Sequence, residues 1–307
     1  MFSRLFSESG LSLDRLRALV EVGSFGSIVR AAEGDPTRQS QYSRQIKELE
    51  DFFRVPLAER QGKGLRLTVA GKELARISRF FLLGLSNFQG GCLAEGQSYA
   101  IGAGATFTAV FLLPLLAGNR EPRGRVRFRV ETVVGDDVER RLHDLTLDFG
   151  VVTRAALSRP LQTRTLGRWR LRLWVPRKLC RTALEAKRLW ASRTLSLAWP
   201  LRELAPSEVG WPPDSEPDLG CETFLEAQRA LAGQGLAALL PDFLGPERDR
   251  EQYHALDLAE AEGGPFEYQL AWNPRLLRLN PHAGRRRDHL VERLAAAVAL
   301  AHPEAVR

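Results

Sequence analysis

Residues 38–46 of the 307-residue chain are Arg38-Gln39-Ser40-Gln41-Tyr42-Ser43-Arg44-Gln45-Ile46, and this stretch decides the fold of the N-terminal region. Tyr42, Ile46 and Leu49 recur at helical spacing, which predicts a helix with one buried face. Ala31 and Ala32 indicate a preceding helix that packs closely against it. Gly34-Asp35-Pro36-Thr37 is expected to form the turn between them, with the second helix running from Arg38 to Phe53. The pattern predicts a helix-turn-helix.

The outward face of the second helix carries polar side chains that suit the major groove of DNA. Arginine pairs with guanine edges or phosphate, glutamine with adenine, and serine with phosphate. A solvated polar face is the ordinary explanation for an isolated amphipathic helix, but the helix-turn-helix context favours DNA contact. The candidate contacts on this helix are Arg38, Gln39, Ser43, Arg44 and Lys47.

A short hairpin and a long helix are expected next. Residues 58–60 and 65–67 flank the tight turn Gln61-Gly62-Lys63-Gly64, which is typical of a β-wing. Its basic residues Arg60, Lys63 and Arg66 are candidate phosphate or minor-groove contacts. Thr68 is expected to cap a helix over residues 69–88, which Gly90-Gly91 should end.

The long helix carries an apolar seam at steps of three and four residues, as in a coiled coil. The seam consists of Leu74, Ile77, Phe81, Leu85 and Phe88. It could pack against its own N-terminal region, but a single seam on one helix favours a contact between two copies of the chain.

After Gln97 the pattern changes to alternating strands and helices, which indicates α/β units with parallel sheets and room for two lobes. The proline-containing stretch from Ala205 to Leu219 is expected to be a surface loop. Strands are expected at 99–104, 126–130, 148–152, 171–175, 194–198, 236–240 and 266–272, and helices at 107–116, 136–144, 224–232 and 286–301.

Composition bounds the function less sharply than the motifs do. The net charge of +7 favours an anionic partner, but only five of the 44 basic residues are lysine, so the charge partly reflects an arginine-rich composition. The three cysteines, Cys92, Cys180 and Cys221, lack metal or redox spacing and suit a reducing compartment. No signal peptide or membrane-spanning run is apparent, so a cytoplasmic protein without a membrane partner is expected.

Sequence signals for an enzyme are weak. The five histidines lack metal-ligand spacing, and neither a nucleophile elbow nor a phosphate-binding loop motif is found. We therefore expect no catalytic residues, no metal and no cofactor.

Motifs along nearly the whole chain resemble those of LysR-type transcriptional regulators. The N-terminal motifs are Leu16-Arg17-Ala18-Leu19-Val20-Glu21-Val22-Gly23-Ser24-Phe25, Ala31-Ala32, Tyr42-Ser43-Arg44-Gln45-Ile46-Lys47-Glu48-Leu49-Glu50, Pro56-Leu57-Ala58-Glu59-Arg60 and Leu65-Arg66-Leu67-Thr68-Val69-Ala70-Gly71. Weaker similarity follows in the expected order at Ile101–Gly104, Leu113–Leu116, Leu145–Val152 and Ala232–Pro241. In the family, apolar residues usually stand where this chain has Asp35 and Thr37, and Phe where it has Ala58.

The resemblance implies an α/β protein with an N-terminal winged helix-turn-helix, a dimerising linker helix and a two-lobed effector domain like periplasmic solute-binding proteins. On this basis we expect a DNA-binding domain at residues 1–67, the linker helix at 68–90, and effector-binding lobes at 97–303. The implied partners are double-stranded DNA, a small-molecule effector that could be an organic anion, and further copies of the chain in a homodimer or dimer of dimers. RNA polymerase is a further candidate partner.

Effector-binding residues are expected at helix starts and strand ends. Gly104 allows close backbone approach, and the following helix start offers free N–H groups, so Thr106 lies at an anion-friendly corner; a structural cap is the alternative. The family places an effector contact there, which also implicates Phe107. Further candidates are Thr153 and Trp199 after strands, where open α/β sheets bind ligands, and Thr223 at another helix start. Trp199 suits the core equally well.

The expected function is therefore sequence-specific DNA binding that a small-molecule effector controls. Two alternatives remain open. One is a solute-binding or ligand-storage protein with a vestigial DNA-binding region, suggested by Asp35 and Thr37 in the turn. The other is a regulator that needs no effector and uses its lobes only to assemble.

Overall fold

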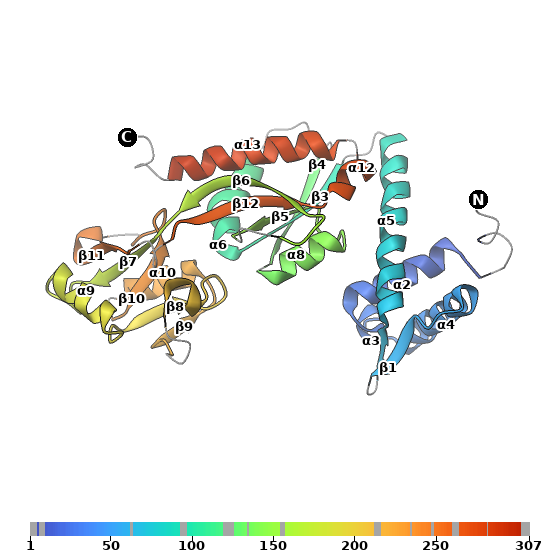
Figure 1. Ribbon diagram of the computed structural model, residues 1–307, viewed down its shortest axis with the longest axis horizontal. Helices are drawn as coiled ribbons and strands as arrows, with labels where there is room; N and C mark the ends of the chain where they lie inside the picture. The colour runs from blue at the N-terminus through green and yellow to red at the C-terminus, as the bar shows by residue number, and fades with distance from the viewer. Residues whose placement is uncertain are drawn as a thin grey trace. The chain divides into compact units, whose positions relative to one another are not determined.

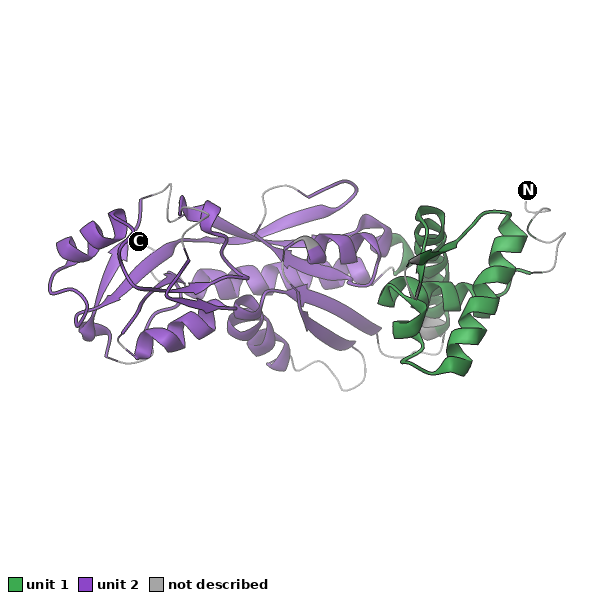
Figure 2. Cartoon of the chain, turned by 90° about the horizontal axis from the view of Figure 1, so that it is seen from below, with its two compact units in different colours: residues 1–96, 278–281 green, residues 97–277, 282–307 purple. Residues whose placement is uncertain are grey.

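The computed structural model describes residues 5, 10–61, 64–92, 97–118, 126–133, 135–153, 157–211, 216–233, 235–246, 249–259, 264–280 and 282–301. The chain divides into two compact units, coloured separately in Figure 2. The N-terminal unit comprises Met1–Gly96 with Arg278–Pro281, and the C-terminal unit comprises Gln97–Leu277 with His282–Arg307.

The N-terminal unit contains the winged helix-turn-helix expected from the sequence (Figure 1). Its elements are α2 (Leu13–Phe25), α3 (Ile28–Ala31), α4 (Pro36–Phe53), β1 (Ala58–Gln61), β2 (Gly64–Leu67) and α5 (Val69–Cys92). Strands β1 and β2 pair antiparallel, with Ala58 opposite Leu67. One apolar cluster joins α2, α3, α4, the wing and the start of α5.

Helix α2 ends at Gly26, which adopts the left-handed conformation at φ 73°. In this unit two other helix ends differ from the sequence prediction. Helix α4 begins at Pro36 instead of Arg38, because Asp35 caps it and proline suits the first helical position. Helix α5 runs through Gly90 and Gly91 to Cys92; glycine weakens a helix by only about 1 kcal/mol and need not end it.

Gly71 fixes the junction between the wing and α5. A Cβ atom at this position would lie 2.0 Å from the Leu57 carbonyl oxygen, so no other residue fits without moving the backbone. The same carbonyl accepts a hydrogen bond from the Thr68 backbone N–H at 3.0 Å. Close backbone contact therefore sets where α5 leaves the wing.

The C-terminal unit has two lobes, each built on a five-stranded sheet. The first lobe has strand order β4-β3-β5-β12-β6 and the second has β11-β7-β10-β8-β9. Their bounds are β3 (Gln97–Ala103), β4 (Val126–Thr132), β5 (Phe149–Val152), β6 (Gln162–Trp169), β12 (Phe266–Trp272), and β7 (Leu171–Pro176), β8 (Leu197–Pro200), β9 (Leu219–Cys221), β10 (Ala237–Pro241), β11 (Tyr253–Asp257).

Both sheets are mixed rather than parallel, which corrects the sequence prediction. Strand β3 is parallel to β4 and β5, but β12 is antiparallel to β5 and β6. In the second lobe β10 is parallel to β8 and antiparallel to β7. The chain enters the second lobe after β6 and returns to the first as β12, so strands distant in sequence become neighbours.

Helices flank the sheets (Figure 1). They are α6 (Ala105–Phe107), the π-helical turn η1 (Thr108–Leu112), α7 (Leu113–Ala117), α8 (Asp136–His143), α9 (Ala183–Ala191), α10 (Phe224–Ala232), α12 (Pro274–Leu279) and α13 (Ala283–Ala301). Helices α6, η1 and α7 are continuous from Ala105 to Ala117. Helix α13 packs along β6. Across the described part of the chain, every helix is too short or too polar to span a membrane.

The first part of the stretch expected to be a surface loop, residues 205–211, is anchored in the second lobe. It contains the 3-10 turn η2 (Pro206–Val209), and both Val209 and Trp211 are buried. Strand β8 also begins three residues later than expected, at Leu197. The prolines suggested an exposed loop, but Val209 and Trp211 supply apolar anchors that hold it against the core.

Candidate nucleic-acid interface and ligand corner

Helix α4 is held against the N-terminal core by the three apolar residues that the sequence singled out. Tyr42, Ile46 and Leu49 are all buried. The Tyr42 hydroxyl donates a hydrogen bond to the Glu21 carboxylate, which is the main reason that the pKa of Tyr42 is raised. Arg38 Nη2 donates to the same hydroxyl at 3.3 Å. This network fixes the rotation of α4 about its own axis.

Asp35 explains why the turn departs from the apolar pattern. Its carboxylate accepts hydrogen bonds from the backbone N–H groups of Thr37 at 2.8 Å and Arg38 at 3.5 Å. Gly34 takes the left-handed conformation that the tight turn requires, at φ 82°. The polar residues therefore form a helix cap, and the turn is well defined. This removes the observation that suggested a vestigial DNA-binding region.

The predicted DNA contacts on α4 lie on its outer side. Arg38, Arg44 and Lys47 are exposed, and Gln39 and Ser43 are half-buried. Arg44 Nε lies 3.7 Å from Glu48 Oε1, and Lys47 Nζ lies 3.6 Å from Asp51 Oδ1. Exposed pairs of this kind are worth at most about 1 kcal/mol, so these cations can exchange their partners for phosphate.

The wing presents its two described arginines on opposite faces. Arg60 faces Leu65 across the ribbon and Arg66 faces Glu59, and successive side chains of a strand alternate between faces. Both arginines are exposed. Lys63, the third predicted basic contact, lies outside the described residues.

Helix α5 leaves most of its apolar seam uncovered. Ile77, Phe81, Leu85 and Phe88 are between 44% and 74% exposed. Leu74 differs, because it is half-buried and packs on the N-terminal core. The helix is also joined to α2, since Arg79 donates hydrogen bonds to the Val20 carbonyl and the Ser24 hydroxyl. The four exposed residues, which we call the α5 stripe, form a continuous apolar surface.

The corner after β3 is filled by a carboxylate of the chain itself. Thr106 lies at the start of α6, where its backbone N–H donates to Glu203 Oε1 at 2.9 Å and its hydroxyl donates to Oε2 at 2.5 Å. The Phe224 N–H, at the start of α10, donates to Oε2 at 2.8 Å. Sequence analysis identified Thr106 but missed Glu203, because the contact joins residues 97 positions apart.

Phe107 lies in an aromatic cluster between the two lobes. Its ring centroid lies 4.7 Å from that of Tyr268 on β12, and Phe111 lies 5.0 Å from Phe243, which follows β10. Tyr268 is buried, and burial together with the charges of Glu203 and Asp242 raises its pKa. The hydroxyl therefore stays neutral at physiological pH.

The other predicted effector residues have different surroundings. Trp199 is buried, and its Nε1 donates to the Leu204 carbonyl at 2.9 Å, so it supports the turn that carries Glu203. Thr223 caps α10 by accepting from the Glu226 N–H at 3.2 Å. Thr153 is exposed at the end of β5. The structure thus brings Thr106 and the start of α10 together.

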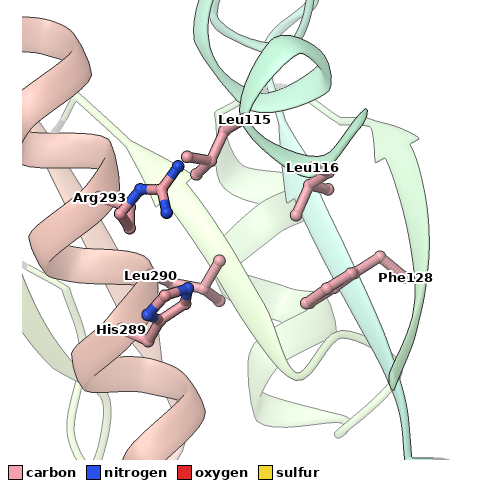
Figure 3. Close-up of a pocket in the computed structure, with 6 residues that line it drawn as sticks. All are labelled: Leu115, Leu116, Phe128, His289, Leu290 and Arg293. Carbon is pink, nitrogen blue, oxygen red and sulfur yellow. The ribbon is translucent and has the colours of Figure 1, made fainter. Parts of the chain in front are cut away.

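Two surface hollows lie elsewhere in the C-terminal unit. The one in Figure 3 is small and mainly apolar, and α13 contributes His289, Leu290 and Arg293 to it. It is completed by Leu115, Leu116 and Phe128. The second lies beside Arg193 and Trp211, where the guanidinium is 4.7 Å from the ring centroid. Neither is lined by a predicted effector residue.

Both units match sequence models of one family. Residues 13–72 match the model described as bacterial regulatory helix-turn-helix protein, lysR family, and residues 95–295 match the LysR substrate binding domain. The chain belongs to the LysR family of transcriptional regulators. The fold and the family resemblance expected from the sequence are therefore confirmed.

Curated relatives of this LysR-family chain cover it only in part. A probable RuBisCO transcriptional regulator from Gracilaria tenuistipitata var. liui is 34% identical over 134 residues, which are 39% of this chain and 41% of the relative. The HTH-type transcriptional regulator CbbR from Xanthobacter flavus is 26% identical over 51% of this chain and 48% of its own. The alignments thus span less than half of these relatives.

Solved structures support the fold over nearly the full length. A full-length OxyR variant from Pseudomonas aeruginosa gives a TM-score of 0.63 at 19% identity, covering 94% of this LysR-family chain and 95% of its own. ArgP from Mycobacterium tuberculosis gives 0.61 at 16% identity, with 94% and 97% covered. At these identities the likeness concerns the fold alone.

Proposed function

We propose that this LysR-family chain is a sequence-specific DNA-binding transcriptional regulator controlled by a small-molecule effector. The observation that carries the proposal is the division of α4 into two faces. One face is locked to the core through Tyr42, Ile46 and Leu49, while Arg44 and Lys47 stay exposed on the other. A rigid helix with an exposed polar face and an adjacent wing suits insertion into the major groove.

Within this interface each type of side chain has a distinct role. Gln39, in the first turns of α4, is the candidate for a base edge, because helix-turn-helix proteins read bases with the N-terminal part of this helix. Arg44 can pair with guanine or phosphate. Arg38, Ser43, Lys47 and the wing arginines are assigned to the DNA backbone. These contacts would set position and affinity, and base contacts would set specificity.

The α5 stripe would join two copies of the chain. Four exposed apolar side chains on one helix favour a coiled-coil-like contact between identical helices. A homodimer places two copies of α4 on one duplex, and a dimer of dimers places four. The spacing between half-sites then follows from the geometry of the assembly.

The two lobes would convert effector binding into a change of that geometry. A ligand that binds one arrangement of the lobes more tightly shifts a pre-existing equilibrium towards it. Altered spacing of the DNA-binding units would change DNA bending and the footprint, with consequences for RNA polymerase. An effector that binds without changing the footprint would contradict this mechanism.

The deciding experiment measures fluorescence anisotropy of the full chain on its own upstream intergenic DNA and on a scrambled duplex. We expect tighter binding to the native sequence and at least tenfold weaker binding for Arg44→Ala. Arg164→Ala, which removes one exposed charge from β6 in the other unit, is the matched control and should bind like the wild type. Binding that is equal for both duplexes and disappears as the salt concentration rises would contradict specific recognition of that DNA.

A further inference from the structure

The carboxylate of Glu203 accepts three hydrogen bonds, two of which link the two lobes. Glu203 follows β8 in the second lobe, while two of its donors belong to Thr106 at the start of α6 in the first lobe. The third donor is the Phe224 N–H at the start of α10. Each carboxylate oxygen therefore accepts at least one short hydrogen bond, and the contact spans the place where an effector is expected.

The surroundings show that this corner is shaped for a carboxylate. Thr106 is 1% exposed, so its hydroxyl and N–H are withdrawn from water. Gly104 leaves room for the ligand, because an added Cβ would lie 3.2 Å from Glu203 Oε1. Donors from two helix starts converge on the same anion, and the partial positive charge of both helix ends favours it.

The backbone around Glu203 holds the side chain in place. The Glu203 N–H donates to the Pro200 carbonyl at 3.0 Å, and Leu204 donates to the same carbonyl at 3.0 Å. Trp199 Nε1 secures the far side of this turn through the Leu204 carbonyl at 2.9 Å. The Glu203 side chain therefore projects from a turn that several hydrogen bonds stabilise.

We propose that Glu203 is an internal ligand of this corner, which holds the lobes together in place of an effector and which an external carboxylate must displace in order to bind. This inference deepens the proposed function, on which it rests, by naming the chemical class of the ligand and the residue that opposes it. Glu203 acts as a positioning residue that sets the equilibrium between lobe arrangements.

Competition follows from the geometry. A tethered carboxylate is present at a high effective concentration, so a free anion of equal intrinsic affinity cannot replace it at ordinary concentrations. An anion entering without displacement would meet the negative charge of Glu203, whose carboxylate already occupies the Thr106 donors. An effector that succeeds must therefore gain additional contacts elsewhere.

Removal of the internal carboxylate should uncover an anion site. We would measure the thermal unfolding midpoint of the full chain in sodium acetate and in sodium chloride at equal ionic strength. Acetate at about ten times its Kd should raise the midpoint of Glu203→Ala by about 3–5 °C, while the wild type shifts by less than about 1 °C. The double variant Glu203→Ala with Thr106→Val should show a smaller response, because it lacks the hydroxyl donor and keeps the two N–H donors.

Two results would overturn the proposal. An equal acetate response in wild type and Glu203→Ala would show that Glu203 does not compete for the corner. A folded Glu203→Ala variant that ignores acetate would show that the donors do not form an anion site and that Glu203 only caps the two helices.

Hydrogen exchange supplies a second measurement at the donors themselves. The amides of Thr106 and Phe224 should be protected in the wild type, exposed in Glu203→Ala and protected again by acetate; failure of acetate to restore protection would count against the proposal. Should Glu203→Ala not fold, Glu203→Asp is the alternative. Its side chain is one methylene shorter, so it should lose protection at one of the two amides, and unchanged protection at both would oppose the proposal.

Neither measurement involves DNA, which separates this inference from the proposed function. A missing acetate response in a protein that still binds its own DNA would reject the internal ligand alone. Absent DNA binding with a clear acetate response would reject the regulator proposal and leave the corner as a carboxylate site.

Discussion

Asp148 connects two strands of the first lobe through a half-buried carboxylate. It accepts a hydrogen bond from the Ala100 N–H at 2.7 Å, while its own N–H donates to the Ala100 carbonyl at 2.9 Å. Burial raises the pKa of Asp148 from 3.8 to about 6, although the Ala100 hydrogen bond and the charge of Arg129 act in the opposite direction. The native state therefore holds this proton more tightly than the unfolded chain does.

The raised pKa of Asp148 makes the folded protein less stable as the pH rises. Because the folded pKa lies above the unfolded value, the stabilising contribution of protonated Asp148 is complete below about pH 3.8 and is lost as pH rises through about 6. The loss amounts to no more than about 3 kcal/mol. Asp148→Asn keeps an acceptor for Ala100 and removes the titration, so its free energy of unfolding should fall less between pH 4 and 6.5 than that of the wild type.

Urea unfolding followed by tryptophan fluorescence measures this difference, because all six tryptophans belong to the C-terminal unit. Asp257→Asn is the matched control, since Asp257 is an exposed carboxylate paired with Arg172 at 2.8 Å. Parallel pH profiles for wild type and Asp148→Asn would refute the prediction.

Asp35 stabilises the start of α4 in the N-terminal unit. Asp35→Ala removes the acceptor for the Thr37 and Arg38 N–H groups and should destabilise the start of α4 by about 1 kcal/mol. Asp35→Asn, which can still cap, should cost less. Hydrogen exchange at these two amides measures the effect, and unchanged exchange in Asp35→Ala would show that the cap contributes nothing.

At the scale of elements, the sequence predicted those helices and strands whose formation depends on residues close together in the chain. Helix α10 and strand β12 have the bounds expected from periodicity, and the wing follows from glycines between short strands. Strands β6 and β11 were missed because each pairs with a strand distant in sequence and carries little alternation, and β9 was missed because it has only three residues. Long-range pairing also produced the antiparallel neighbours that made the sheets mixed.

The α5 stripe gives a prediction about assembly. Replacing Ile77 and Phe81 with serine removes two of the four exposed apolar side chains from the stripe and should shift the chain to a smaller species in sedimentation equilibrium. The helix should remain folded, because its attachment to α2 through Arg79 is untouched. Leu300→Ser on α13 is the control, as Leu300 is 84% exposed. An unchanged mass for the double variant would place the dimer contact elsewhere.

At the scale of the whole molecule, the Thr106 corner depends on contacts that no local sequence pattern predicts. Thr106 was predicted from the glycine before it and the helix start after it, both of which are local features. Its partner Glu203 comes from another lobe, and only the folded topology brings the two together. The same holds for Tyr268, whose burial arises from aromatic residues of both lobes.

Salt dependence tests how the DNA-binding surface acts as a whole. Each phosphate neutralised by an arginine or lysine contributes about 0.9 to the slope of log K against log salt. Arg60→Ala on the wing should therefore lower the slope by about one on native and scrambled duplexes alike, since a backbone contact carries no sequence information. Gln39→Ala should instead leave the slope unchanged and reduce the preference for the native duplex. Anisotropy titrations over a range of salt concentrations separate these effects, with Arg164→Ala controlling for net charge. A slope that falls equally for Arg60→Ala and Arg164→Ala would attribute the attraction to the overall charge of +7 and not to the wing.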